Sequence, residues 1–429
     1  MLFCNIDLLD EHLNWKRGQY VGVRNDTIEY IGSTEPSADY GERYDGRHRL
    51  LLPGFYNVHS HAPMTMLRGY AENLPLDRWL NEKVFPFEDQ LTAKYVYYGT
   101  QLAIAEMLQC GTVSFTDMYF ECQAMAKAVL ESGIKCNLSR GLTVFDDSAY
   151  DEQLPAYRDN MDLIGNYHNA GEGKLQVDLC IHGEYTSTPK IVDAVAAQAK
   201  EYGLRMHIHL SETQAEHEAC KQRYGLTPAA YMESHGVFDV PTTAAHCVWL
   251  EDGDFDILKR HGVTVACCPA SNLKLASGYA NVPEMMRQGI AVALGTDGAA
   301  SNNNLNILKD LYLFAIAYKG YYHDSTLITP QEALYAATRA GACSQGRKDS
   351  GLLKVGCRAD LCVLDVDTPQ FTPMTDAACN VVYAAQGTDI RLTMVDGKVL
   401  YRDGEYLTLD IERVKYEAQQ GTQEILTSL

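Results

Sequence analysis

The chain has 429 residues, enough for one large domain with an appendage or for two to three ordinary domains. Its 46% hydrophobic and 21% charged residues are typical of a globular protein with a sizeable core. The formal net charge of −20 repels phosphate backbones and anionic membrane surfaces, so neither nucleic acid polymers nor membranes are expected as partners. A small neutral molecule in a local pocket is compatible with this charge.

The first residues and the cysteines indicate where the protein works. Acids at Asp7, Asp10 and Glu11 stand where a signal peptide has a basic end and an unbroken apolar run. No run reaches the ~18 apolar residues of a membrane span. The thirteen cysteines are scattered without a CxxC pair, which favours free thiols in a reducing compartment. We therefore expect a cytoplasmic protein.

Short alternating segments mark both ends of the chain. Tyr20–Arg24 near the start and Ala359–Asp365 near the end have the pattern of small antiparallel strands. We expect residues 1–52 and 352–429 to form one composite β-sandwich domain.

Between these ends, apolar runs alternate with helical segments. Val263–Cys268 is typical of the first kind and Lys190–Tyr202 of the second. Such alternation predicts βα units around a parallel sheet, and roughly 300 residues suit a (β/α)8 barrel. We expect that α/β barrel to occupy residues 53–351. A doubly wound open sheet is the alternative, but no Gly-rich dinucleotide fingerprint follows any strand.

Four apolar strands of the expected barrel end in residues that suit a divalent metal ion. A lone His-x-His pair or a lone strand-end aspartate has simpler explanations, as a core histidine or a helix cap. The coincidence of four such ends is not explained by caps and packing, and it predicts a metal site at the barrel mouth. The residues at these ends are His59 and His61, His209, His246, and Asp297.

The expected ligands are His59, His61, His209 and Asp297, which leaves a coordination position for water, as a catalytic metal site requires. A bound metal ion lowers the pKa of that water towards neutrality. His207 faces the same side of its strand as His209, but it lies further from the strand's carboxyl end, so we assign it to packing.

Two further residues suit proton transfer. Glu212 follows His209 by three residues, and His246 ends its own strand. Histidine and a tuned carboxylate are the side chains that move protons near neutral pH. We therefore expect Glu212 and His246 to carry protons rather than to bind the metal.

These motifs, in this order, resemble those of the amidohydrolase superfamily. The segment Pro53–Ala71 resembles its nucleoside deaminase branch, and the nearest match is the 5-methylthioadenosine/S-adenosylhomocysteine deaminase family. The resemblance covers nearly the whole chain. It implies a hydrolase that uses a metal-bound hydroxide to convert the 6-amino group of an adenine nucleoside into an inosine-type product and ammonia.

The resemblance also implies the cofactor and the catalytic roles. Members with two metals carry a lysine on the fourth strand, and Val177–His182 has none, so one ion is expected. That ion is usually zinc, although iron, manganese and cobalt suit the same ligands. Glu212 would protonate the ring nitrogen, Asp297 would take the proton of the attacking water, and His246 would stabilise the developing oxyanion.

The substrate contacts implied by the resemblance involve six residues. Glu88 would accept hydrogen bonds from ribose hydroxyls, Trp79 would pack beside the nucleoside, and Ser301 would line the base pocket. His182 would lie near the reacting base, although Gly183 and Glu184 replace the usual Ala-Pro after it. The full set is Trp79, Glu88, Arg140, His182, Glu212 and Ser301.

Arg140 bears on which nucleoside is preferred. It matches one of two arginines that some family members direct at the homocysteine carboxylate, and the second arginine has no counterpart. The chain after Phe145 is acidic instead. The sequence therefore favours methylthioadenosine, adenosine or 5'-deoxyadenosine over S-adenosylhomocysteine.

Other functions stay open at this point. A related deaminase or hydrolase of guanine, an oxidised purine, cytosine or an s-triazine would share the metal centre but would not need Glu88 and Trp79. A non-catalytic scaffold or a closed structural metal site would not need the proton carriers. The expected partner is a small-molecule nucleoside, and the formation of homo-oligomers is left open.

Overall fold

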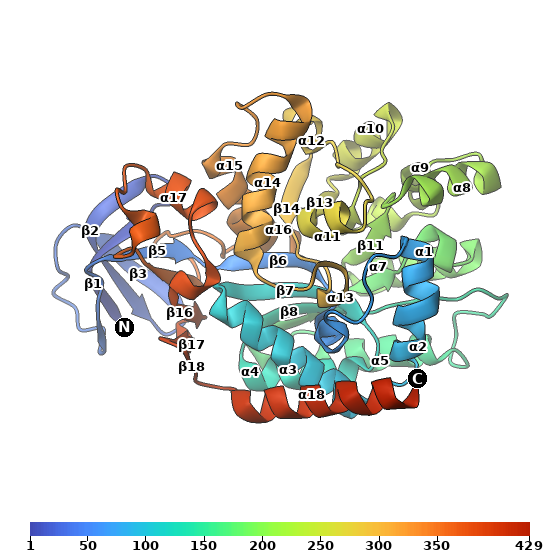
Figure 1. Cartoon of the computed structure of the whole chain (residues 1–429), viewed down its shortest axis with the longest axis horizontal. Helices are drawn as coiled ribbons and strands as arrows, with labels where there is room; N and C mark the ends of the chain where they lie inside the picture. Colours follow the sequence, from blue (N-terminus) through green and yellow to red (C-terminus); the bar gives the residue numbers. More distant parts are fainter.

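The computed structural model describes the backbone of all 429 residues and every side chain except that of Asp77. A ring of parallel strands surrounded by helices fills most of the molecule, and a mixed sheet lies at one end (Figure 1). This arrangement confirms the expected α/β class with a (β/α)8 barrel. Within the described part of the chain, no helix is both long and apolar enough to span a membrane.

The barrel strands run in chain order from β6 to β14. Asp178 interrupts one of these strands and divides it into β9 and β10. The Asp178 amide bonds to the Leu138 carbonyl of β8 at 3.0 Å, and the Leu179 amide bonds to the Arg205 carbonyl, next to β11, at 2.9 Å. β9 and β10 therefore act as one strand between β8 and β11. The Asp297 amide bonds to the His59 carbonyl at 2.9 Å and joins the end of β14 to β6. The strands are β6 (Phe55–Ser60), β7 (Thr112–Tyr119), β8 (Lys135–Arg140), β9 (Leu175–Val177), β10 (Leu179–Ile181), β11 (Met206–Leu210), β12 (Thr242–His246), β13 (Thr264–Cys267) and β14 (Ala291–Leu294).

Burial on both faces accounts for the composition of these strands. Every residue of β7, β11 and β12 is buried, because the helices cover one face and the barrel interior fills the other. The larger helices are α3 (Ala93–Gln109), α4 (Cys122–Ser132), α5 (Pro155–Tyr167), α7 (Pro189–Tyr202), α8 (Gln214–Tyr224), α9 (Pro228–Ser234), α10 (Asp252–His261), α12 (Val282–Gln288), α14 (Ile307–Tyr322) and α15 (Pro330–Tyr335).

Short helical segments occupy the connections, most of them at the carboxyl ends of the strands. They are η1 (Ala62–Leu67), α1 (Leu76–Trp79), η2 (Leu80–Val84), α2 (Phe85–Glu88), α6 (Ala170–Gly173), η3 (Glu184–Thr186), η4 (Val237–Asp239), α11 (Pro269–Lys274), α13 (Ala299–Asn302), η5 (Ala336–Ala340) and α16 (Gly341–Ser344).

Both ends of the chain contribute to the second sheet, whose order is β18-β17-β16-β15-β5-β1-β2-β3, with β4 paired to β1. β5 lies between the two ends, because it pairs with β1 on one side and with β15 on the other, where Pro53 is opposite Leu361. The strands are β1 (Leu2–Leu9), β2 (Trp15–Arg24), β3 (Thr27–Gly32), β4 (Arg43–Asp45), β5 (Arg49–Pro53), β15 (Leu361–Asp365), β16 (Ile390–Val395), β17 (Lys398–Arg402) and β18 (Glu405–Tyr406).

The chain beyond residue 352 does not stay with this sheet throughout. Helix α17 (Ala377–Tyr383) packs on α14 and α15, and helix α18 (Ile411–Ser428) lies along α3, where the Thr422 hydroxyl donates to the Met66 carbonyl at 3.0 Å (Figure 1). η6 (Pro369–Phe371) and η7 (Gly387–Asp389) complete this part. The division into residues 1–52 with 352–429 and residues 53–351 therefore remains a proposal. Helix α18 belongs to the first part by sequence but contacts the barrel helix α3.

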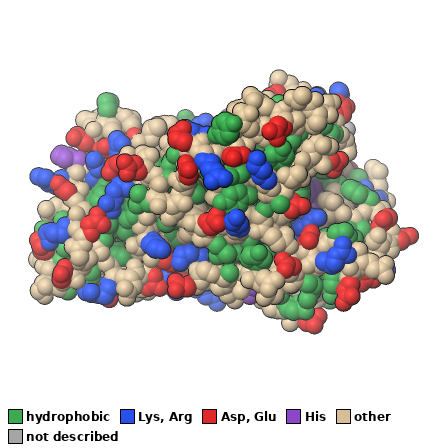
Figure 2. Space-filling view, turned by 90° about the horizontal axis from the view of Figure 1, so that it is seen from below, with side chains coloured by type: hydrophobic (Ala, Val, Ile, Leu, Met, Phe, Trp, Pro, Cys, Tyr) green, Lys and Arg blue, Asp and Glu red, His purple; other side chains and the backbone are tan. Residues whose placement is uncertain are grey.

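The acidic excess is not gathered on the face of the molecule seen from the α18 side. Figure 2 shows Asp and Glu side chains interspersed there with Lys and Arg, and apolar side chains between them. On this face the acidic side chains are therefore spread over the surface rather than concentrated in one patch.

Candidate active site

The candidate site is a pocket of about 570 Å³ at the carboxyl ends of the barrel strands. This is the end where (β/α)8 enzymes place their chemistry. All the sequence-predicted site residues except the fully buried His59 line it, namely His61, Trp79, Glu88, Arg140, His182, His209, Glu212, His246, Asp297 and Ser301. The structure therefore brings the predicted residues together.

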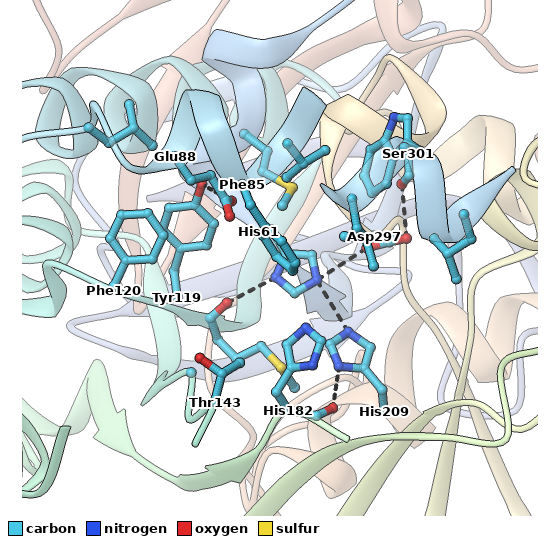
Figure 3. A pocket seen from close by; sticks show the side chains of 18 of the residues that line it. His61, Phe85, Glu88, Tyr119, Phe120, Thr143, His182, His209, Asp297 and Ser301 are labelled. Atoms are coloured by element: carbon cyan, nitrogen blue, oxygen red, sulfur yellow. Dashed lines mark hydrogen bonds and ion pairs between the residues drawn. The ribbon is translucent and has the colours of Figure 1, made fainter. Parts of the chain in front are cut away.

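The imidazoles of three predicted ligands are each oriented through Nδ1. His61 Nδ1 donates to the Met118 carbonyl at 2.9 Å, and His209 Nδ1 donates to the His182 carbonyl at 2.6 Å (Figure 3). His59 Nδ1 lies 2.9 Å from His207 Nε2. His207, assigned to packing from the sequence, thus holds the ring of His59. Hydrogen bonds at Nδ1 leave the Nε2 lone pairs free to bind a metal ion.

The Nε2 atoms converge with one carboxylate oxygen. His61 Nε2 lies 3.4 Å from His209 Nε2, and Asp297 Oδ1 lies 3.4 Å from Nε2 of both His59 and His61. His59 Nε2 is buried without a hydrogen-bond partner. Lone pairs that face one another in a buried site repel unless a proton or a cation lies between them. This donor set therefore fits a divalent metal ion.

His246 belongs to this cluster as well. One ring nitrogen from each of His59, His209 and His246 lies within 4.8 Å of those of the other two residues. His246 Nδ1 donates to Asn272 Oδ1 at 2.9 Å, and its Nε2 lies 3.9 Å from Glu212 Oε2. The ring therefore faces both the predicted ligands and the predicted acid.

Burial sets the ionisation of these groups. It lowers the pKa of His59 to about 3, which keeps the ring neutral and able to bind a metal ion. Burial opposes the charged form of Asp297, but the hydrogen bond and charge of His59 hold the pKa of that carboxyl well below its usual range. Burial also raises the pKa of Glu212, as a proton donor requires, with His246 working in the opposite direction.

Two of these side chains sit on unusual backbone. His246 has φ +72° and Asp297 has φ +64°, both in the left-handed region. A non-glycine residue there costs on the order of 1 kcal/mol or more, and such positions cluster at functional sites. The chain turns sharply at the ends of β12 and β14, and this turn directs both side chains into the pocket.

The backbone around Glu212 is fixed by a second carboxylate. The Glu216 side chain accepts hydrogen bonds from the amides of Ser211 at 3.0 Å and Glu212 at 2.7 Å, and it completes a capping box with Thr213 at the start of α8. Burial raises the pKa of Glu216 to about 7. This role of Glu216 was not predicted from the sequence, although Thr213 and Glu216 have the spacing of a capping box.

The opposite end of the pocket holds the residues expected to contact ribose. Glu88 Oε1 accepts a hydrogen bond from the Tyr119 hydroxyl at 2.5 Å, and Tyr119 stacks on Phe120 (Figure 3). Burial raises the pKa of Glu88 to about 7, although the bond from Tyr119 lowers it. Trp79 is buried and donates from its indole to the Ala71 carbonyl at 3.2 Å. Tyr119 was not identified from the sequence.

Arg140 is already paired in the structure. Its Nε lies 3.0 Å from Asp159 Oδ2, and its guanidinium also donates to the Gly141 carbonyl. Phe145 beside it is 74% exposed. Arg140 is thus partly neutralised before any substrate binds.

The departure after His182 has a structural explanation. The Glu184 carboxylate is buried and accepts hydrogen bonds from Arg223 of α8 at 2.5 and 2.7 Å. This ion pair joins the loop that follows His182 to the helix that follows Glu212.

Comparison with known proteins agrees with this geometry. The model of the amidohydrolase family matches residues 50–400. The chain therefore belongs to the amidohydrolase family and is a metal-dependent hydrolase. Within that family it belongs with the 5-methylthioadenosine/S-adenosylhomocysteine deaminases. It is 42% identical over 401 residues to the protein of that name from Dictyoglomus thermophilum, across 94% of this chain and 93% of the relative. Relatives at 38 to 41% identity carry the same name.

Solved structures support the same fold and cofactor. An adenosine deaminase from Xanthomonas campestris with bound zinc superposes with a TM-score of 0.92 at 28% identity, covering 99% of this chain and 98% of that one. The atrazine chlorohydrolase TrzN from Arthrobacter aurescens with zinc gives a TM-score of 0.91 at 23% identity, covering 98% and 99%, which shows the fold alone. The zinc-bound adenosine deaminase, the family match and the His/His/His/Asp arrangement together identify the cofactor as one divalent metal ion, with zinc favoured.

Proposed function

We propose that this protein hydrolytically deaminates adenine nucleosides, with methylthioadenosine, adenosine or 5'-deoxyadenosine as the preferred substrates. The observation that carries the proposal is that one pocket joins a metal-binding centre to the carboxyl of Glu88 on the opposite wall. Its volume of about 570 Å³ falls in the range of small-molecule sites. Relatives named 5-methylthioadenosine/S-adenosylhomocysteine deaminase support the same substrate class.

His59, His61, His209 and Asp297 are the proposed metal ligands, since their donor atoms converge. A divalent ion held there would supply a nucleophilic oxygen from water near neutral pH.

The chain's own residues would handle the protons. Glu212, whose pKa is raised by burial, would donate a proton to the purine ring nitrogen next to the attacked carbon. Asp297 would accept the proton that water loses, and His246, with a proton on each ring nitrogen, would donate a hydrogen bond from Nε2 to the oxygen that gains charge. The proton on Asp297 would then pass to the amino group, which leaves as ammonia when the carbon–nitrogen bond breaks, and the remaining hydroxyl proton would return to Glu212, so that nucleoside plus water gives the inosine-type product plus ammonia.

The remaining contacts would position the nucleoside. Glu88 would accept hydrogen bonds from ribose hydroxyls, with Trp79 packed beside the sugar. His182 and Ser301 line the same cavity towards the base. Arg140, paired with Asp159, is poorly placed to attract a carboxylate, which favours short neutral 5'-substituents over homocysteine.

Ammonia release tests this proposal. The zinc-loaded protein is offered methylthioadenosine, adenosine, 5'-deoxyadenosine, S-adenosylhomocysteine, adenine, guanine, cytosine and an s-triazine, with chelated protein as the control. We expect turnover of the nucleosides and none after chelation. Activity on a free base or a triazine alone would replace the proposal with a related hydrolase, and silence throughout would favour a scaffold.

Two further expectations stay proposals of the same kind. A cytoplasmic location follows from the scattered cysteines and is tested by cell fractionation. Self-association is tested by light scattering of the zinc-loaded protein.

A further inference from the structure

One short segment after β13 contacts each of the three residues that handle protons. Its Ser271, Asn272 and Ser277 are buried, and none of them was singled out from the sequence. We propose that residues 271–277 form a positioning element, in which Asn272 fixes the ring of His246 and Ser271 fixes the carboxylate of Asp297. This inference rests on the proposed function. It adds residues that contact neither the histidine nitrogens proposed to bind the metal nor the purine.

The contact between Asn272 and His246 determines which ring nitrogen faces the pocket. An amide oxygen can only accept, so the 2.9 Å contact from His246 Nδ1 to Asn272 Oδ1 places a proton on Nδ1. His246 Nε2 is then the atom that faces Glu212, at 3.9 Å, and the pocket. A ring rotated by 180° would present carbon to the substrate, and Asn272 opposes that rotation.

Ser271 acts on the other side of the centre. Its hydroxyl donates to Asp297 Oδ2 at 2.5 Å, and Ser301 lies 2.9 Å from the same oxygen. The Gly298 amide donates to Oδ1 at 2.8 Å. The carboxylate is therefore held at both oxygens. Ser271 therefore fixes the orientation of this carboxylate from the side opposite Gly298.

Ser277 completes the set with a longer contact. Its Oγ lies 3.5 Å from Glu212 Oε1 and orients the proposed acid weakly. Of the three contacts, that of Ser277 is the longest and therefore the weakest. The substitutions that test the proposal are at Asn272 and Ser271.

The segment is itself anchored on the barrel. The Asn272 amide bonds to the Cys268 carbonyl at 3.0 Å, directly after β13, and the Gly278 amide bonds to the Asn272 carbonyl at 3.3 Å. The buried carboxylate of Asp310 on α14 accepts from the Ala270 amide at 3.0 Å. Catalytic groups held by a rigid support need little reorganisation during the reaction, which is the condition for efficient electrostatic catalysis.

The test compares two substitutions at Asn272 in the zinc-loaded protein. Asn272→Leu removes the acceptor and is expected to lower kcat by about 10- to 100-fold with KM and zinc content unchanged, the scale for residues that orient metal-site groups. Asn272→Asp keeps an oxygen acceptor and is expected to restore most of kcat. Equal losses in both variants, or full activity of Asn272→Leu, would overturn the role of Asn272.

The second comparison concerns Ser271. Ser271→Ala is expected to lower kcat by about 10-fold or more with KM and zinc content unchanged, because the carboxylate of Asp297 loses one of the groups that orient it. Ser132→Ala, which removes a buried hydroxyl on α4 outside the pocket, is the matched control and should retain wild-type kcat. If the two serine variants behave alike, Ser271 has only a packing role.

A spectroscopic measurement separates this inference from the proposed function. In protein labelled with ¹⁵N at histidine, the His246 signal, assigned by its loss in His246→Gln, should report a proton on Nδ1 in the wild type and in Asn272→Asp. An Nδ1 without a proton in the wild type would overturn the inference even if the enzyme is active. Absence of deaminase activity with a protonated Nδ1 would overturn the proposed function and leave the positioning element standing.

Discussion

The two ends of the pocket are built differently. At the metal end, His59 is fully buried and His61, His209 and Asp297 nearly so, each held through a hydrogen bond by another part of the chain. At the mouth, Phe145 is 74% exposed and Arg140 is held by an ion pair with Asp159. The proposed metal ligands thus lie in or just after barrel strands, whereas at the mouth Arg140 ends β8, Asp159 lies on α5, and the exposed Phe145 lies on the loop between them.

We therefore expect substitutions at the metal end to change the kinetic constants strongly and substitutions at the mouth to change them weakly. A fixed, dry environment strengthens every electrostatic interaction, and a solvated one weakens it. Substitutions along the pocket therefore test the comparison, in the order of the effects expected.

The largest loss is expected at Glu212. Glu212→Gln keeps the size of the side chain but removes the proton donor, so kcat should fall by about 10²-fold or more. The measurement is steady-state kinetics on methylthioadenosine together with zinc content, which should not change. A metal-loaded variant with a near-normal rate would exclude Glu212 from the mechanism.

A smaller effect is expected at Glu88, on the wall of the pocket opposite the metal centre. Glu88→Gln loses the charged acceptor for ribose hydroxyls, and KM for nucleosides should rise by about 10-fold or more, the scale of hydrogen bonds to charged groups. The reaction of free adenine, if detectable, serves as the control because it has no ribose. Equal changes for nucleoside and base would assign Glu88 a structural role.

The pH dependence of KM provides a third comparison. The pKa of Glu88 lies at about 7, so its carboxylate is ionised above that pH and protonated below it. KM for nucleosides should rise by about 5-fold from pH 7 to pH 6, as the ionised fraction falls from a half to about a tenth. In Glu88→Gln, which cannot ionise, this rise should disappear; its persistence would point to another group.

The smallest effect is expected at the mouth. Asp159→Asn releases Arg140 from its ion pair, and KM for S-adenosylhomocysteine relative to methylthioadenosine should fall by about 3-fold, as for partly exposed pairs. Asp151→Asn removes a nearby charge that does not contact Arg140 and controls for the general field. A change as large as that at Glu212 would contradict the distinction between the two ends.

The same distinction explains what the sequence could predict. The barrel and the residues His59, His61, His209, His246 and Asp297 follow from apolar strands that end in metal-compatible side chains, a pattern local in sequence. Tyr119 and Ser271 act through contacts with residues 31 and 26 positions away, and no local pattern marks such pairs. Ser271 and Asn272 do follow the end of β13, so a search of every strand end would have drawn attention to them.

The composite sheet was also predictable, because both ends of the chain carry the same alternating texture. The position of α18 was not. Its contact with α3 depends on side chains more than 300 residues apart, such as Tyr95 and Glu424, which are 2.5 Å apart.

The place of β5 between the two ends of the chain has a consequence for how the protein folds. β5 continues through Gly54 into β6, the strand that carries His59 and His61, and its partner β15 is separated from it by about three quarters of the sequence. Pairings of such long range close late and slow folding. A nascent chain therefore synthesises every proposed metal ligand before the sheet that anchors the first two can close, and only the arrival of Leu361–Asp365 completes that anchor.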